Sequence, residues 1–262
     1  MIHVIVPVKN EELKIIQTLN MLLATCCDKI IVVLNGCEDR SLQIVEGFVH
    51  EKIDYIYFNK SLGVDIPRTI GAQLAMKDNT DGIVFVDGDM NGRIEKHVNE
   101  IIYALKEKKM DMALTNCYPK KEKISYLASM LLSFRKLLNL ELNIFERISY
   151  STPSHGPHGL SRRFLETIPL RELAIPPVSL ALAVENQLLV DIATTIPVSL
   201  LSSTTRDTFH ANQIAKTIIG DCIEAVQFFN GKERTRCCGG ITFTGYHKNR
   251  RFDILESYLS SF

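Results

Sequence analysis

The sequence predicts an α/β protein whose central sheet is mostly parallel and flanked by helices. Short apolar runs typical of buried strands alternate with longer stretches whose apolar residues recur at helical spacing. The chain has 262 residues, of which 46% are hydrophobic and 23% are charged. This composition is ordinary for a globular protein and sufficient for one large α/β domain, so we expect a single domain over residues 1–262.

The first half of the chain predicts strands and helices in alternation. The predicted strands are His3–Val8, Lys29–Leu34, Ile53–Phe58, Gly82–Val86 and Asp111–Asn116. The predicted helices are Glu12–Ala24, Ser41–His50, Ile66–Lys77 and Glu95–Lys108. The first helix has Ile16, Leu19 and Leu23 at helical spacing. Strands that alternate with helices predict a parallel sheet covered on both faces.

The second half is less regular. The prolines and glycines of residues 151–159 predict a loop, and the tail from Gly239 is polar and hard to place. The helices predicted here are Ile124–Leu140, Ser161–Thr167, Pro177–Ala193 and Gln213–Phe229, and the one strand is Thr195–Leu201. The amphipathic helix 124–140 suits packing on the sheet, contact with a membrane-borne acceptor, or a homodimer interface.

Charge and cysteine content exclude several classes of protein. Thirty basic and thirty acidic residues give a net charge of +0, so we expect no nucleic-acid partner. We expect no secretory signal in the first residues, and no transmembrane segment because Glu185, Asn186 and Asp191 interrupt the most apolar stretch. The seven cysteines show no Cys-x-x-Cys spacing, which predicts reduced thiols and a cytoplasmic protein.

The acidic pair Asp87 and Asp89 follows the buried run at 82–86. In an open α/β sheet, ligands bind outside the carboxyl ends of the strands. Two carboxylates at such an edge suit a divalent cation that holds a diphosphate, although an isolated Asp-x-Asp is more often a solvated turn. The ends of the neighbouring strands therefore decide between these interpretations.

Polar groups follow the other strands as well. The first strand is stopped by Pro7 and followed by Asn10 and Glu11, and the second is followed by Asn35 and Asp39. After the third come Gly63 and Arg68. Carboxylates, amides, a glycine and a cation at one edge are the mixture that a nucleotide needs.

These motifs, in this order, resemble family-2-type glycosyltransferases of the GT-A fold. The matching segments are 4–12, 33–39, 63–75 and 85–89, which cover roughly the first ninety residues. The resemblance implies a nucleotide-binding half at 1–117 and an acceptor-binding half at 118–262. It also implies that the motifs after the first two strands hold the base and ribose, that Gly63 and Arg68 lie beside the diphosphate, and that the Asp-x-Asp coordinates Mn²⁺ or Mg²⁺.

A weaker resemblance in the second half is to glucosyl- and mannosyl-3-phosphoglycerate synthases. It implies an acceptor loop with His155, Gly156, Gly159 and Arg162, and a metal-binding His210 beside Asp89. Glu185 would be the general base of an inverting reaction, or would orient the sugar or acceptor in a retaining one. The acceptor implied is a small anion, a glycan or a lipid-linked molecule.

Local alternatives remain for these residues. His210 could cap a helix, Arg162 could be solvated, and Glu185 could pair with an arginine on the helix surface. The sequence departs from the family pattern at Leu34 and Cys37, which leaves the base undetermined. Two other functions stay open: a nucleotidyltransferase that acts on sugar phosphates, and a non-catalytic nucleotide-binding module.

Overall fold

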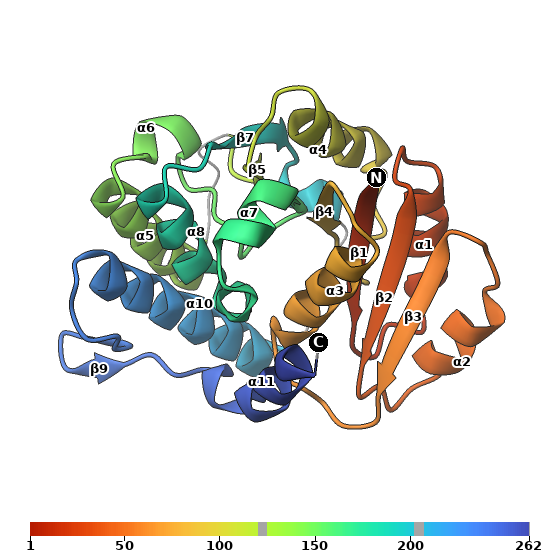
Figure 1. Cartoon of the computed structure of the whole chain (residues 1–262). Coiled ribbons are helices and arrows are strands. Elements are labelled where there is room, and N and C mark those ends of the chain that lie inside the picture. The colour runs from red at the N-terminus through yellow and green to blue at the C-terminus, as the bar shows by residue number, and fades with distance from the viewer. Residues whose placement is uncertain (120–124, 202–206, 262) are drawn as a thin grey trace.

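The computed structural model describes residues 1–119, 125–201 and 207–261. One seven-stranded sheet runs through the molecule in the order β3-β2-β1-β4-β6-β5-β7, and all of its strands except β6 run parallel (Figure 1). Its strands are β1 (Ile2–Val8), β2 (Lys29–Asn35), β3 (Ile53–Phe58), β4 (Gly82–Phe85), β5 (Met112–Asn116), β6 (His158–Ser161) and β7 (Val190–Thr195). A short hairpin of β8 (Cys237–Cys238) and β9 (Ile241–Thr242) stands apart.

Helices cover both faces of this sheet. They are α1 (Ile15–Leu23), α2 (Ser41–Gly47), α3 (Ile66–Lys77), α4 (Glu95–Lys106), α5 (Tyr126–Glu141), α6 (Phe145–Ile148), α7 (Arg162–Thr167), α8 (Pro176–Glu185), α9 (Val198–Leu201), α10 (Thr208–Phe229) and α11 (Phe252–Ser260). Two 3₁₀ turns span Leu170–Ala174 and His247–Asn249. None of the described helices is both long and apolar enough to cross a membrane.

Alternation along the central strands divides the core into two layers. Val4 and Val6 of β1 face a cluster shared with α1 and α4, whereas Ile5 belongs to a cluster shared with α3, α8 and α10. Because neighbouring side chains of a strand point to opposite faces, a strand apolar at every position must be covered on both. This is the covered parallel sheet that the first half of the sequence predicts.

The second half corrects three predicted elements. Residues 158–161 form β6, which inserts antiparallel between β4 and β5, and this short strand gave no apolar run of its own. The predicted helix Pro177–Ala193 ends at Glu185 because Gln187 adopts a left-handed φ of 55°, and the chain then enters β7. The predicted strand Thr195–Leu201 is wrong because β7 ends at Thr195 and α9 follows Pro197.

Helices α10 and α5 are among those that begin elsewhere than expected. Helix α10 starts at Thr208, where the Asp207 carboxylate accepts the N–H of His210 at 2.7 Å as an N-cap. Helix α5 starts at Tyr126, and Ile124 lies outside the described residues. Helix α5 packs along α10 and contacts α6, so the expected packing of this segment directly on the sheet is replaced by helix–helix contact.

Candidate active site

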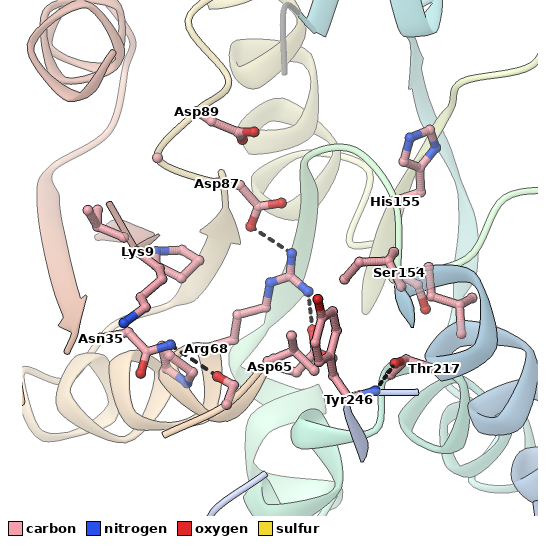
Figure 2. A pocket seen from close by; sticks show the side chains of 18 of the residues that line it. Lys9, Asn35, Asp65, Arg68, Asp87, Asp89, Ser154, His155, Thr217 and Tyr246 are labelled. Atoms are coloured by element: carbon pink, nitrogen blue, oxygen red, sulfur yellow. Dashed lines mark hydrogen bonds and ion pairs between the residues drawn. The ribbon is translucent and has the colours of Figure 1, made fainter. Parts of the chain in front are cut away.

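A crevice opens at the carboxyl ends of the parallel strands, where the topology predicts ligand binding. The cavity has a volume of about 560 Å³. Its walls come from the segments after β1, β2 and β4, from the start of α3, from the loop before β6, from α10 and from the C-terminal segment (Figure 2). Both halves of the chain therefore contribute to one cavity.

The Asp-x-Asp turn lies in this crevice. Both Asp87 and Asp89 line the cavity, and neither side chain is fully exposed. The turn is fixed from two sides, because the Gly88 N–H donates to Pro7 O at 3.1 Å and the Thr18 hydroxyl donates to Gly88 O at 2.9 Å. A Cβ at position 88 would lie 2.9 Å from Val8 Cγ2, so the close approach of the turn to β1 requires glycine.

Arg68 connects the acidic turn to α3. Its guanidinium donates to Asp87 Oδ1 at 2.6 Å and to Asp65 Oδ1 at 2.5 Å. Burial disfavours its charge, but the two carboxylates outweigh burial and raise the pKa of Arg68. Asp65 adopts a left-handed φ of 63° just before α3, a conformation that these ion pairs help to hold. Arg68 thus orients Asp87 and offsets its charge.

Asn35 shapes the floor of the crevice. Its side chain accepts the N–H of Leu62 at 2.6 Å and donates to Gly63 O at 3.1 Å, which fastens the loop after β3 to the end of β2. Gly63 lines the cavity with φ at 86°, and the backbone of Asn249 packs so closely on it that a Cβ would clash. The C-terminal segment therefore seals this side of the crevice.

Four residues predicted after the first two strands divide into two pairs. Pro7 and Glu11 line the cavity. Asn10 and Asp39 are not among its lining residues, and both hold neighbouring loops instead. Asn10 Oδ1 accepts the N–H of Glu38 at 2.8 Å, and Asp39 accepts backbone N–H groups of Glu12 and Ser41. Asn10 and Asp39 therefore stabilise the loops beside the crevice and do not line it.

His155 and Gly156 reach the crevice from the loop before β6, opposite Lys9 and Asn35 (Figure 2). The His155 ring stacks on Tyr118 with centroids 5.5 Å apart. Burial, and then the charge of Arg135, lower the pKa of His155 to about 3. This imidazole is therefore neutral at physiological pH, which suits a hydrogen-bonding role better than a role as a cationic clamp.

His210 lies in the first turn of α10 and lines the cavity. Its Nδ1 is 2.9 Å from the hydroxyl of Tyr246. Tyr246 is positioned in turn by its backbone N–H, which donates to Thr217 Oγ1 at 2.7 Å. A hydrogen bond from a neighbouring group to one ring nitrogen is the usual support of a metal-binding histidine, and Tyr246 supplies such a contact at Nδ1.

Three predicted site residues lie elsewhere. Glu185 is exposed at the end of α8, shortly before β7 begins. The first residue of β7 pairs with the first residue of β5, so Glu185 lies near the amino ends of these parallel strands, at the sheet edge opposite the crevice. Arg162 is at that same edge, where its N–H donates to Asp81 O and its guanidinium pairs with Glu166. Gly159 is buried within β6 under α4. The geometry contradicts their catalytic and acceptor-binding assignments.

The structure adds site residues that the sequence analysis missed. Asp65, Thr217 and Tyr246 line the crevice, as do Ser154 and Asn249. Asp65 precedes Ile66-Pro67, and this proline at the helix start was the only local sign of its position. The tail that carries Tyr246 has no apolar periodicity, so nothing in the sequence placed it beside α10.

The donor groups in the crevice suit a hard divalent cation. Asp87, Asp89 and His210 line one cavity, which offers carboxylate oxygens and an imidazole nitrogen. A second acidic cluster, Asp221 and Glu224 with His247, is neutralised by arginines: Arg236 contacts Asp221 at 2.6 Å and Glu224 at 3.0 Å. In the crevice Arg68 likewise pairs with Asp87, and Asp89 and His210 are the two candidate ligands that the sequence analysis predicts there.

Sequence comparison assigns the chain to a family. The family model described as Glycosyl transferase family 2 matches residues 3–168, more than half of the chain. The chain belongs to glycosyl transferase family 2. This confirms the predicted glycosyltransferase and its GT-A α/β fold. A comparison of the sequence with curated proteins finds no match.

Solved structures of the same fold are glucosyl-3-phosphoglycerate synthases from Mycobacterium tuberculosis. The complex with phosphoglyceric acid is 16% identical with a TM-score of 0.61, and the match covers 88% of this chain and 80% of that one. The complex with Mg²⁺ and uridine-diphosphate gives the same four values. The complex with Mn²⁺, UDP-glucose and phosphoglyceric acid is 16% identical with a TM-score of 0.57, and covers 85% and 79%. At this identity the likeness concerns the fold.

Proposed function

We propose that this glycosyltransferase moves a sugar from a nucleotide diphosphate sugar to an acceptor hydroxyl with the help of Mn²⁺ or Mg²⁺. The observation that carries the proposal is the convergence of Asp87, Asp89 and His210 with Asn35 and Arg68 on one crevice. Support comes from structures of the same fold, which hold Mn²⁺ or Mg²⁺ together with uridine-diphosphate or UDP-glucose.

Each residue has a role that follows from its contacts. Asp89 and His210 would hold the metal ion, which when bound offsets the charge of the leaving diphosphate. Arg68 keeps Asp87 in place through their 2.6 Å ion pair. The segment between Pro7 and Glu11, with Asn35 and Gly63, would bind the nucleoside. The loop at His155 and Gly156 would receive the acceptor on the other side of the metal.

The acceptor and the location are finer proposals. The related synthases bind phosphoglyceric acid, which favours a small anionic acceptor over a glycan or a lipid-linked one. A cytoplasmic location is supported by the cysteines, all seven of which are free.

Substitution of Asp89 by alanine tests the metal site. We expect the variant to lose the metal-dependent part of nucleoside diphosphate binding, since a carboxylate ligand is removed. The measurement is calorimetric binding of UDP, GDP and ADP with and without Mn²⁺. Glu185→Gln is the acidic control at the opposite sheet edge and should bind as the wild type does. Unchanged affinity of the Asp89 variant in Mn²⁺ would remove the metal assignment.

Product analysis separates the transferase from its rivals. Incubation with nucleotide sugars and phosphoglyceric acid should release free nucleoside diphosphate together with a glycosylated acceptor. A nucleotidyltransferase would instead form or consume pyrophosphate. Metal-dependent binding without any turnover would identify a non-catalytic nucleotide-binding module.

A further inference from the structure

Helix α5 buries an arginine that has no ionic partner among the residues that the structure describes. The buried residues of α5 are Arg135, Leu138 and Asn139, and Arg135 is only 1% exposed. Its guanidinium carbon lies 5.9 Å from the centroid of the Tyr118 ring. In the part of the chain that the structure describes, no carboxylate pairs with this cation, and its Nε has no hydrogen-bond partner. A buried cation normally has an anion beside it.

The loop before β6 contains a second group of unpaired polar atoms. The hydroxyls of Ser151, Thr152 and Ser154 and the Nδ1 of His155 are all buried, and none has a hydrogen-bond partner within residues 1–119, 125–201 and 207–261. The loop is fastened to α5 one turn beyond Arg135, because Asn139 Nδ2 donates to Ser151 O at 3.0 Å. Since buried polar atoms are almost always paired, so many unpaired atoms in one loop indicate a bound group with several acceptor atoms.

This loop faces the proposed active site. Ser154 and His155 line the same crevice as Asp89 (Figure 2). The Tyr118 ring lies against both His155 and Arg135, which connects the crevice wall to the buried guanidinium. A charged group that enters from the crevice therefore meets Ser154 and His155, and the Tyr118 ring connects His155 to Arg135.

We propose that Arg135 and the hydroxyl groups of Ser151, Thr152 and Ser154 form an anion subsite that binds the phosphate or carboxylate of the acceptor. The proposal rests on the proposed transferase function and its small anionic acceptor, and adds the residues that would bind the anionic group. An arginine is suited to this task because its planar guanidinium binds phosphate and carboxylate with paired hydrogen bonds. The role expected for Arg162 thus passes to a residue on α5.

Phosphate binding tests the subsite directly. The wild type is first saturated with Mg²⁺ and the nucleoside diphosphate that binds it best, so that the probe cannot occupy the metal site. Inorganic phosphate and phosphoglyceric acid are then titrated, with melting temperature and calorimetry as readouts. We expect Arg135→Met to weaken phosphate affinity by about tenfold or more, and Arg135→Lys to weaken it less. Phosphate affinity that survives in Arg135→Met overturns the subsite.

Lys136→Met is the matched control. Lys136 is the next residue of α5, is exposed, and lies over the Phe145 ring at 5.4 Å, so it is a cation on an aromatic ring outside the proposed subsite. Its variant should bind phosphate as the wild type does. If Arg135→Met does not fold, Thr152→Val and Ser154→Ala take its place. Wild-type affinity in both of these also overturns the proposal.

The titration of His155 gives a readout that a purely structural role of Arg135 would not move. An anion bound beside the loop favours the imidazolium, so phosphate should raise the pKa of His155 above its free value of about 3 in nuclear magnetic resonance spectra. Absence of this change under saturating phosphate counts against the subsite. Failure of the wild type to bind any nucleoside diphosphate with Mg²⁺ would instead refute the proposed transferase function.

Discussion

At the scale of single residues, the site depends on side chains that orient other side chains. Arg68 holds Asp87, Asn35 holds the loop at Gly63, and Tyr246 contacts His210. Such supporting contacts fix the direction in which a ligand atom points, and their loss typically costs tenfold to a hundredfold in metal affinity. The hydroxyl of Tyr246 is the most specific of them, because its contact with Nδ1 fixes the orientation of the His210 ring.

Substitution of Tyr246 by phenylalanine tests this support. The ring and its packing remain while the hydroxyl is lost, so we expect Mn²⁺ affinity in the presence of a nucleoside diphosphate to fall by about tenfold. Folding should be unaffected, which a melting curve checks. Tyr258→Phe, on α11 and outside the residues that line the crevice, is the control. Equal Mn²⁺ affinity in wild type and Tyr246→Phe would show that His210 needs no such partner.

Single residues were predictable where a strand fixed their position. Asp87, Asp89, Asn35 and Arg68 follow or flank elements whose bounds the sequence defines well, so their convergence followed from topology. The position of Glu185 was not predictable in this way, because the apolar stretch around it predicts one continuous helix, Pro177–Ala193, whereas α8 ends at Glu185. The left-handed Gln187 turns the chain there, and Glu185 stays in solvent.

At the scale of elements, the C-terminal segment is held to the start of α3 and to α10 by buried ion pairs. Arg250 contacts Asp65 at 2.7 Å and Asp221 at 2.7 Å, and Asp65 is also the partner of Arg68. Burial disfavours the ionised form of Asp221, but Arg250 and Arg236 outweigh it and lower its pKa. This network links the start of α3 to α10 and to the segment before α11, which lie more than 130 residues further along the chain.

Arg250→Met should therefore loosen both the fold and the crevice. The arginine side chain is 0% exposed, and its removal leaves Asp65 and Asp221 with fewer counterions. Breaking a buried pair in this way costs about 3–5 kcal/mol, measured by urea unfolding. Nucleoside diphosphate affinity should fall as well, because Asp65 lines the crevice and would keep only one of its two arginine partners, Arg68.

Arg251→Ala is the control for this prediction. Arg251 is the next residue and pairs with Asp253 at the surface, so its loss should leave the free energy of unfolding close to that of the wild type. If Arg250→Met unfolds like Arg251→Ala, the buried network does not stabilise the fold.

Elements of the second half were harder to predict because contacts between residues distant in sequence determine them. Pairing with β4 and β5 makes β6 a strand, although its four residues carry no strand pattern. The position of the tail depends on ionic contacts of Arg236 and Arg250 with distant residues. Local periodicity cannot reveal either kind of contact. In the first half, by contrast, long apolar runs and helical spacing agree with the tertiary contacts.

At the scale of the whole molecule, neutral buried histidines make stability depend on pH. Burial is the first cause that lowers the pKa of both His155 and His158 to about 3, and the charges of Arg135 and Arg68 lower them further. In the unfolded chain a histidine titrates near about 6.5. Between these values the unfolded state binds more protons than the folded state, so the free energy of unfolding falls as pH falls from about 6.5.

Urea unfolding at pH 7, 6 and 5 measures this effect. Each buried neutral histidine contributes a slope of at most about 1.4 kcal/mol per pH unit below its unfolded pKa. The lowered pKa of Asp221 affects stability in a more acidic pH range. Stability from a depressed carboxyl pKa is lost only as pH falls below the unfolded value of about 3.9. His158, in β6, packs against Phe85 of β4 and is not among the residues that line the crevice. We therefore expect His158→Gln to reduce the pH slope of the free energy of unfolding between pH 7 and 5 by the contribution of one histidine. Nucleotide binding should remain intact. An unchanged slope in that variant would mean that His158 titrates alike in the folded and unfolded states, and that its neutral burial contributes nothing to the pH dependence.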